Sequence, residues 1–114
     1  MKLSIIIPYD RYKQYLHDCL ESVYEQRLND YETLLVVNNK KEIDQDIKAY
    51  DINLKILEAG ENSSVAKKRN IGLEHASGEY IYFIDCYDYL MPNTLKLLIT
   101  CANQNDLDLV AGIR

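Results

Sequence analysis

An apolar run that ends in acidic residues is the part of this sequence best suited to chemistry. Residues 80–84 are apolar or aromatic, Asp85 follows them directly, and Asp88 comes three residues later. In open α/β sheets, ligands bind outside the carboxyl ends of the strands. Carboxylates in that position can hold a hard divalent cation against a phosphate-bearing ligand. Asp85 and Asp88 are therefore candidate metal ligands, although aspartate also has ordinary roles at turns.

Five apolar runs predict the strands that would position these carboxylates. They are residues 3–7, 33–37, 54–57, 80–84 and 107–113, and Pro8 stops the first of them. In the first two runs the apolar residues follow one another rather than alternate with polar ones, which indicates strands that are buried on both faces, as in a parallel sheet.

Helical patterns lie between the predicted strands. Apolar residues recur at three- and four-residue steps within 12–25, which predicts an amphipathic helix. Residues 62–64 offer capping side chains for a helix through residue 75, and Pro92 suits the first turn of another. Strands that alternate with helices predict an α/β fold of three αβα layers, with a mostly parallel sheet and helices on both faces.

Length and composition exclude several classes of protein. A chain of 114 residues is close to the size of one domain, so residues 1–114 are expected to form a single domain. The net charge of −5 disfavours nucleic acid as a partner. Cys19, Cys86 and Cys101 are far apart and lack zinc-site spacing, which favours reduced thiols and a cytoplasmic location. No run approaches the ~20 apolar residues of a membrane span, so any membrane association would come from regions outside this chain.

The order of these features resembles the amino-terminal half of family 2 glycosyltransferases, which are inverting enzymes with the GT-A fold. The resemblance covers nearly the whole chain, and together its segments are specific, whereas each alone would be weak. It implies that the chain ends before the acceptor half and that the general base lies beyond Arg114. The segments that carry the resemblance are residues 4–8, 19–26, 34–37, 62–73 and 78–92.

The resemblance also implies a nucleotide-sugar site with an associated metal. An arginine near the acidic turn could reach that turn or the diphosphate. A Mg²⁺ or Mn²⁺ ion would neutralise charge on the departing nucleoside diphosphate. Residues implied to bind the nucleotide sugar are Pro8, Tyr9, Asp10, Asn38, Asn39, Arg69, Asn70 and Asp85, and those implied to bind the metal are Asp85 and Asp88.

The chain departs from the family pattern at the acidic positions of this site. Asn38 and Asn39 replace expected aspartates, and Tyr87 replaces the middle aspartate of the metal motif. Asp10-Arg11 stands where the family has an aromatic residue followed by asparagine. Either the donor specificity has shifted, or the site has decayed and the domain serves as a scaffold or partner-binding module. An unrelated doubly wound nucleotide domain is disfavoured, because none of the four glycines forms a GxGxxG or P-loop pattern.

The interpretation that follows is a family 2-type transferase. It would move a sugar from a nucleotide diphosphate sugar, such as a UDP-sugar, to a glycan or lipid-linked acceptor in bacterial cell-surface polysaccharide synthesis. Apolar surface left exposed by the missing half would favour a homo-oligomer.

Overall fold

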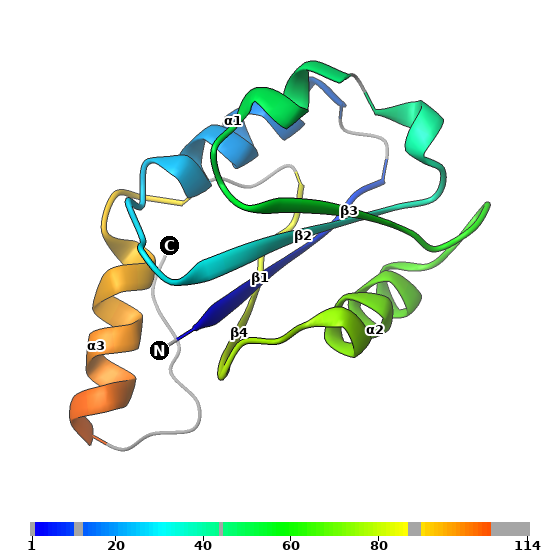
Figure 1. The fold of residues 1–114 in the computed structure, drawn as a ribbon. Helices are drawn as coiled ribbons and strands as arrows, with labels where there is room; N and C mark the ends of the chain where they lie inside the picture. Colours follow the sequence, from blue (N-terminus) through cyan, green and yellow to red (C-terminus); the bar gives the residue numbers. More distant parts are fainter. Residues whose placement is uncertain (1, 11–12, 44, 87–89, 106–114) are drawn as a thin grey trace.

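Strands and helices alternate along the chain in the computed structural model, which describes residues 2–10, 13–43, 45–86 and 90–105 (Figure 1). Two short 3₁₀ helices, η1 and η2, occupy the polar segment between the second and third strands. The elements in chain order are β1 (Leu3–Pro8), α1 (Lys13–Tyr24), β2 (Tyr31–Val37), η1 (Lys40–Glu42), η2 (Gln45–Ala49), β3 (Leu54–Glu58), α2 (Val65–His75), β4 (Tyr80–Phe83) and α3 (Thr94–Asn105).

The described strands form one parallel sheet in the order β3-β2-β1-β4. Leu3 of β1 is in register with Tyr31 of β2 on one side and with Tyr80 of β4 on the other. β1 therefore lies inside the sheet, which explains why all six of its residues are buried. The parallel α/β prediction is confirmed. The predicted fifth strand, residues 107–113, lies outside the described residues.

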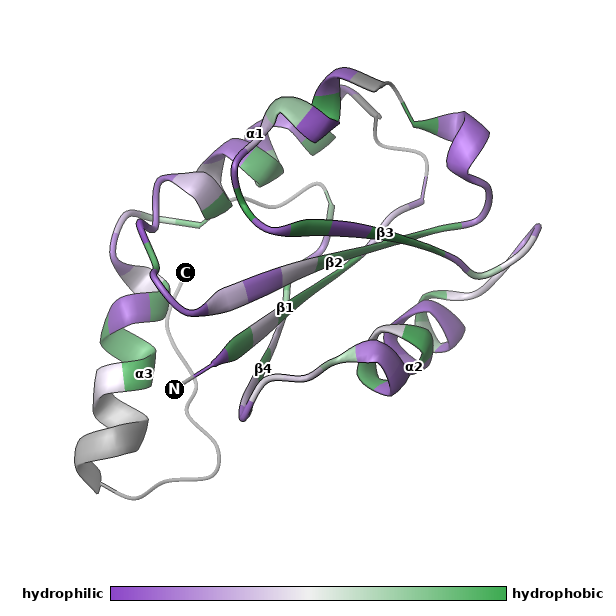
Figure 2. Ribbon diagram, in the orientation of Figure 1, coloured by the Kyte–Doolittle hydropathy of each residue, from purple (hydrophilic) through white to green (hydrophobic). Residues whose placement is uncertain are grey.

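Two separate hydrophobic clusters cover the two faces of the sheet. Ile5 and Ile7 of β1 pack with α1 and α3, whereas Ile6 points to the other face and packs in the cluster beneath α2. Alternate residues of a strand point to opposite faces, so this division follows from the pleat. Figure 2 shows hydrophobic residues along β1 and β2, between the helices. The predicted three-layer arrangement is therefore correct.

Helix α1 buries a narrower stripe than its apolar pattern predicted. Leu16 and Leu20 are fully covered by the sheet, but Tyr15 and Tyr24 at the borders of the stripe keep 46% and 47% of their surface exposed. Strand β4 also ends at Phe83, one residue earlier than predicted, although the backbone N–H of Ile84 still donates to the carbonyl of Ile6 at 3.1 Å.

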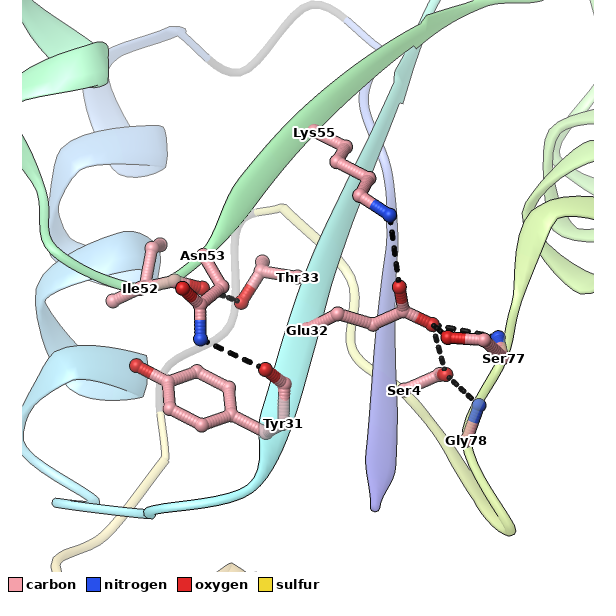
Figure 3. Close-up of polar contacts among 9 residues, drawn as sticks. All are labelled: Ser4, Tyr31, Glu32, Thr33, Ile52, Asn53, Lys55, Ser77 and Gly78. Carbon is pink, nitrogen blue, oxygen red and sulfur yellow. Dashed lines mark hydrogen bonds and ion pairs between the residues drawn. The ribbon is translucent and has the colours of Figure 1, made fainter.

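The amino-terminal edge of the sheet is held by the buried carboxylate of Glu32 (Figure 3). Its Oε2 accepts hydrogen bonds from Ser4 Oγ at 2.6 Å and from the backbone N–H of Ser77 at 2.7 Å. The Ser4 hydroxyl in turn accepts a hydrogen bond from Gly78 N at 2.9 Å. Lys55 on β3 approaches the other carboxylate oxygen at 3.4 Å. This cluster fixes the loop between α2 and β4, and thereby the placement of both elements.

These hydrogen bonds also determine the ionisation of Glu32. Burial opposes the charged form, but the hydrogen bonds from Ser4, Ser77 and Lys55 outweigh it and lower the pKa of Glu32 from 4.5 to about 2. The carboxylate is therefore charged at neutral pH, and its lone pairs are used by partners from β1, β3 and the loop before β4.

Helix α2 lies unusually close to β1. A Cβ atom added to Gly72 would lie 2.5 Å from Cγ2 of Ile6, which is closer than real Cβ atoms come to their neighbours. Only glycine fits at this point of α2 without a shift of the core. Among the residues that the structure describes, no helix is long and apolar enough to cross a membrane.

Candidate functional site

The carboxyl ends of the strands bring the predicted site residues to one edge of the sheet. The backbone N–H of Tyr9 donates to the carbonyl of Val36 at 2.8 Å, which joins the end of β1 to β2. The N–H of Gly60, beyond β3, donates to the carbonyl of Asn38 at 3.1 Å. Because parallel strands all point the same way, the segments after β1, β2, β3 and β4 meet at this carboxyl edge.

Arg69 and Asp85 form the clearest contact at this edge. Nη2 of Arg69 lies 3.6 Å from Oδ1 of Asp85, and the two side chains are 44% and 27% exposed. The guanidinium also lies over the ring of Phe83, with Cζ 5.6 Å from the ring centroid. The expectation that Arg69 can reach the acidic turn is thus met in the geometry. Both charges remain open to solvent and to a ligand.

Asp10 lies near the same turn, as the environment of Cys86 shows. Burial is the main cause that raises the pKa of the Cys86 thiol, and the carboxylates of Asp10 and Asp85 add to the rise. A backbone hydrogen bond from Asp10 acts in the opposite direction and does not overcome the burial. Cys86 is therefore a protonated thiol that packs beneath the turn, and it is unsuited to act as a nucleophile.

Asn38 and Asn39 are engaged in the loops that follow β2 and β3. Asn38 Oδ1 accepts a hydrogen bond from the backbone N–H of Ser63 at 3.3 Å. Asn39 Oδ1 accepts from the N–H of Lys41 at 2.9 Å, and so it caps the first turn of η1. Asn39 Nδ2 also approaches Glu61 Oε1 at 3.4 Å. Both asparagines therefore stabilise loops in this structure. Their contact with a nucleotide stays a prediction.

The remaining predicted residues are divided between the core and the surface. Pro8 ends β1 and is buried, and Tyr9 is 3% exposed within the core cluster. The Tyr9 ring thus packs as a core residue, which was the alternative to stacking on a base. Asn70 is exposed on α2 beside Arg69. Asp88 lies outside the described residues.

Helix α1 and the turn that follows it support the segments on both sides of the acidic turn, a role that the sequence did not reveal. Gln26 is fully buried, and its Nε2 donates to the carbonyl of Met91 at 2.8 Å. Its Oε1 accepts from the backbone N–H of Leu95 at 3.0 Å, which caps the start of α3. Cys19 Sγ lies 3.7 Å from the carbonyl of Asp85. The one available signal was that Gln26 follows Val23 by three residues, where a continued helix would place it on the apolar face.

The described part of the chain offers a metal ion one carboxylate rather than a complete site. No group of three or more His, Cys, Asp or Glu side chains suited to a metal occurs among the described residues. Asp85 nevertheless supplies hard oxygen ligands that are partly exposed. Mg²⁺ is commonly held by one or two carboxylates together with substrate phosphates, so Asp85 fits a metal that is shared with a diphosphate.

A hollow of about 490 Å³ lies elsewhere, along the outer side of β3. Its lining contains none of the predicted site residues, so the candidate site is the open carboxyl edge and not this hollow. The lining residues are Lys40, Ile43, Lys48, Tyr50, Asp51, Asn53, Leu54 and Ile56.

A parallel sheet with helices on both faces defines the α/β class of proteins, in which ligands bind outside the carboxyl ends of the strands. Within that class, the chain belongs to glycosyl transferase family 2, whose model matches residues 4–114. The predicted resemblance is thereby confirmed.

Relatives and solved structures agree with the family. The teichoic acid poly(glycerol phosphate) polymerase of Staphylococcus epidermidis is 36% identical over 111 residues, which cover 92% of this chain and 15% of that protein. The crystal structure of TarS 1-349 from Staphylococcus aureus superposes with a TM-score of 0.84 at 27% identity, covering 93% of this chain and 33% of that one. The same fragment in complex with UDP gives 0.79 at 26% identity over the same shares of the two chains.

A more distant structure supports the fold alone. The mannosyltransferase PcManGT of Pyrobaculum calidifontis, in complex with GDP-Man and Mn²⁺, has a TM-score of 0.71 at 18% identity and covers 88% of this chain and 32% of that one. The chain thus spans about a third or less of the length of each of these proteins.

Proposed function

We propose that this chain is the nucleotide-sugar-binding part of a glycosyltransferase that moves a sugar from a UDP-sugar to a glycan or lipid-linked acceptor. The observation that carries the proposal is the meeting of Arg69 and Asp85 at the carboxyl edge, with Asp10 close by. Family membership supports it, as do the neighbours described as complexes with UDP and UDP-GlcNAc.

The charges at this edge suit a diphosphate. A guanidinium can donate two parallel hydrogen bonds to phosphate oxygens, and Arg69 is exposed enough to turn from Asp85 toward a ligand. The start of α2 lies at the same edge, and the positive end of a helix dipole favours an anion there. Asn38, Asn39 and Asn70 would supply neutral donors and acceptors to the nucleoside.

Asp85 would hold the divalent cation, with Asp88 as the second proposed ligand. When bound, Mg²⁺ or Mn²⁺ would neutralise the negative charge that develops on the departing nucleoside diphosphate. Arg69 would bind the diphosphate from the helix side and so orient the bond that breaks. The general base of an inverting reaction is proposed to lie in the acceptor half, beyond the residues of this chain.

The biological setting is proposed from the same relatives. The names of several refer to teichoic acid or poly(ribitol-phosphate), which supports a role in bacterial cell-surface polysaccharide synthesis. Cys86 is a free thiol, which supports a reducing, cytoplasmic location. Leu97 and Met91 are 67% and 60% exposed and would favour self-association of the isolated chain.

Calorimetric titration with UDP, with and without Mn²⁺, tests the proposed function. We expect the wild-type chain to bind UDP more tightly with Mn²⁺, and Asp85→Ala to lose the Mn²⁺-dependent part of the affinity. Asp51→Ala, an exposed aspartate next to the hollow beside β3, is the matched control and should behave as wild type. A wild-type chain that binds no nucleoside diphosphate under any condition would favour the scaffold alternative.

A further inference from the structure

Lys68 is a buried lysine within the basic run of α2. Only 1% of its surface is exposed, and it is among the largest fully buried side chains of the described residues. Its neighbours in the run, Lys67 and Arg69, are exposed. Lysine is almost never fully buried unless its charge is paired, so this placement needs a reason.

The ammonium group of Lys68 has no partner in the described part of the chain. Its backbone N–H donates to the carbonyl of Ser64 at 3.1 Å, but no carboxylate or carbonyl among the described residues accepts a hydrogen bond from Nζ. Every fully buried side-chain nitrogen or oxygen in those residues has a partner. Nζ must therefore keep a small opening to solvent, while the aliphatic part of the side chain is covered.

The placement of α2 directs the Lys68 side chain toward the carboxyl edge of the sheet. Helix α2 follows β3 and precedes β4, and both strands run parallel, so α2 runs back along the sheet and begins at the carboxyl edge. Gly72 packs on Ile6 in the middle of β1, and Lys68 lies one helical turn before Gly72 on the same side of the helix. Side chains in helices lean toward the amino terminus, so Lys68 extends toward the edge where Arg69 meets Asp85.

We propose that Lys68 is a further ligand-binding residue, whose ammonium group pairs with the diphosphate of the bound nucleotide. This inference rests on the proposed function and adds a specific contact to it. A buried cation with no hydrogen-bonding partner among the described residues, directed toward a site for a phosphate ligand, is preorganised for an anion. The alternative is a structural lysine, whose aliphatic stem covers apolar surface and whose ammonium group is hydrated and binds no ligand.

The test compares Lys68→Met with Lys67→Met, which removes the same charge from an exposed neighbour in the same helix. Calorimetry would measure the affinities for UDP and for uridine. We expect Lys68→Met to weaken the affinity for UDP by at least about tenfold, as for loss of a hydrogen bond between charged groups. The affinity for uridine, which has no phosphate, should be nearly unchanged. Lys67→Met should weaken the affinity for UDP by less than about threefold, because solvent and salt screen an exposed charge.

Thermal unfolding without ligand provides an independent readout. Methionine keeps the apolar stem and removes a charge that has no hydrogen-bonding partner among the described residues, so Lys68→Met should be at least as stable as wild type. A purely structural lysine would instead leave UDP affinity unchanged in Lys68→Met. That result, or equal losses in both variants, would overturn the assignment.

Inorganic pyrophosphate separates this inference from the proposed function. If wild type binds UDP and Lys68→Met binds it equally well, only the Lys68 assignment fails. If wild type binds no UDP, the proposed function fails. In that case, pyrophosphate binding that is lost in Lys68→Met would still establish an anion-binding lysine, and no pyrophosphate binding would overturn both.

Discussion

Arg69 of α2 and Asp85, which follows β4, meet at the carboxyl edge with Nη2 3.6 Å from Oδ1. The contact joins a helix on one face of the sheet to the end of a strand beside β1. At 44% and 27% exposure, the pair contributes little to stability, because exposed ion pairs are worth about 0–1 kcal/mol. Its proposed role is therefore ligand binding rather than stabilisation of the fold.

Replacement of Arg69 should reduce UDP binding without unfolding the protein. We expect Arg69→Ala to weaken the affinity for UDP by about tenfold or more, while the free energy of unfolding of the protein changes by less than about 1 kcal/mol. Arg69→Lys should recover only part of the affinity, because an ammonium cannot donate the paired hydrogen bonds of a guanidinium. Thermophoresis with labelled protein would measure the affinities. Lys96→Ala, on the exposed side of α3, is the control, and unchanged UDP affinity in Arg69→Ala would contradict the role of Arg69.

Glu32 should make stability depend on pH in the acidic range. Its pKa is about 2 in the folded protein against an ordinary 4.5, so its contribution is fully present above about pH 5 and is lost as the pH falls toward 2. A shift of this size corresponds to about 3 kcal/mol, and Glu32→Gln should lose most of it at pH 7. Urea unfolding at pH 7, 5 and 3.5 would measure the difference.

The pH profile distinguishes Glu32 from other carboxylates. The stability difference between wild type and Glu32→Gln should be constant from pH 7 to about 5 and should shrink below that. Glu74→Gln, which changes an exposed residue of α2, should give a profile parallel to wild type. A difference for Glu32→Gln that stays the same down to pH 3.5 would show that its carboxylate is not the source of the stabilisation.

Gly72→Ala should destabilise the chain, although glycine in a helix is normally improved by alanine. The usual gain is about 1 kcal/mol, but the added methyl would lie 2.5 Å from Cγ2 of Ile6. We expect a net loss of about 1–3 kcal/mol from overpacking, measured by urea unfolding. Ile6→Ala alone should cost about 2–5 kcal/mol, and the double variant should lose less than the sum of the two. Additive losses would mean that α2 and β1 do not meet at this contact.

Gln26→Ala should loosen the segment around the acidic turn. The change removes the partners of two backbone groups, the carbonyl of Met91 and the N–H of Leu95. Alkylation of Cys86, which is 2% exposed, should then become at least about tenfold faster under native conditions. Mass spectrometry of the cleaved chain would measure the rate at each cysteine.

Cys19 serves as the internal reference for that experiment. It is fully buried in α1, so global unfolding would expose it together with Cys86, whereas local opening would expose Cys86 first. Gln14→Ala, on the exposed side of α1, should leave both rates unchanged. Equal acceleration at the two cysteines would refute a local role for Gln26.

The sheet and its layers could be predicted because they depend on patterns that are local in the sequence. Continuous apolar runs predicted β1 and β2, and their burial on both faces agrees with the structure. The contact between Arg69 and Asp85 was implied by the resemblance to family 2 glycosyltransferases, which placed an arginine within reach of the acidic turn.

The features that the sequence did not reveal depend on partners distant in the chain. The role of Gln26 comes from its hydrogen bonds to backbone atoms of Met91 and Leu95. Backbone partners cannot be recognised from residue types in the sequence. Lys68 lies in a basic run that is typical of a solvated helix face, and only its packing distinguishes it. Tyr9 follows β1 directly, where the same residue type could stack on a base or complete the core.

The most direct test of a nucleotide site at the carboxyl edge is the ¹H–¹⁵N NMR spectrum of the chain during titration with UDP and Mg²⁺. Shift changes should be concentrated at the backbone amides of Asp10, Asn38, Arg69 and Asp85. The amide of Ser77, bonded to Glu32 at the opposite edge, should not move. Changes confined to that edge or to the hollow beside β3, or no saturable change at all, would contradict the account.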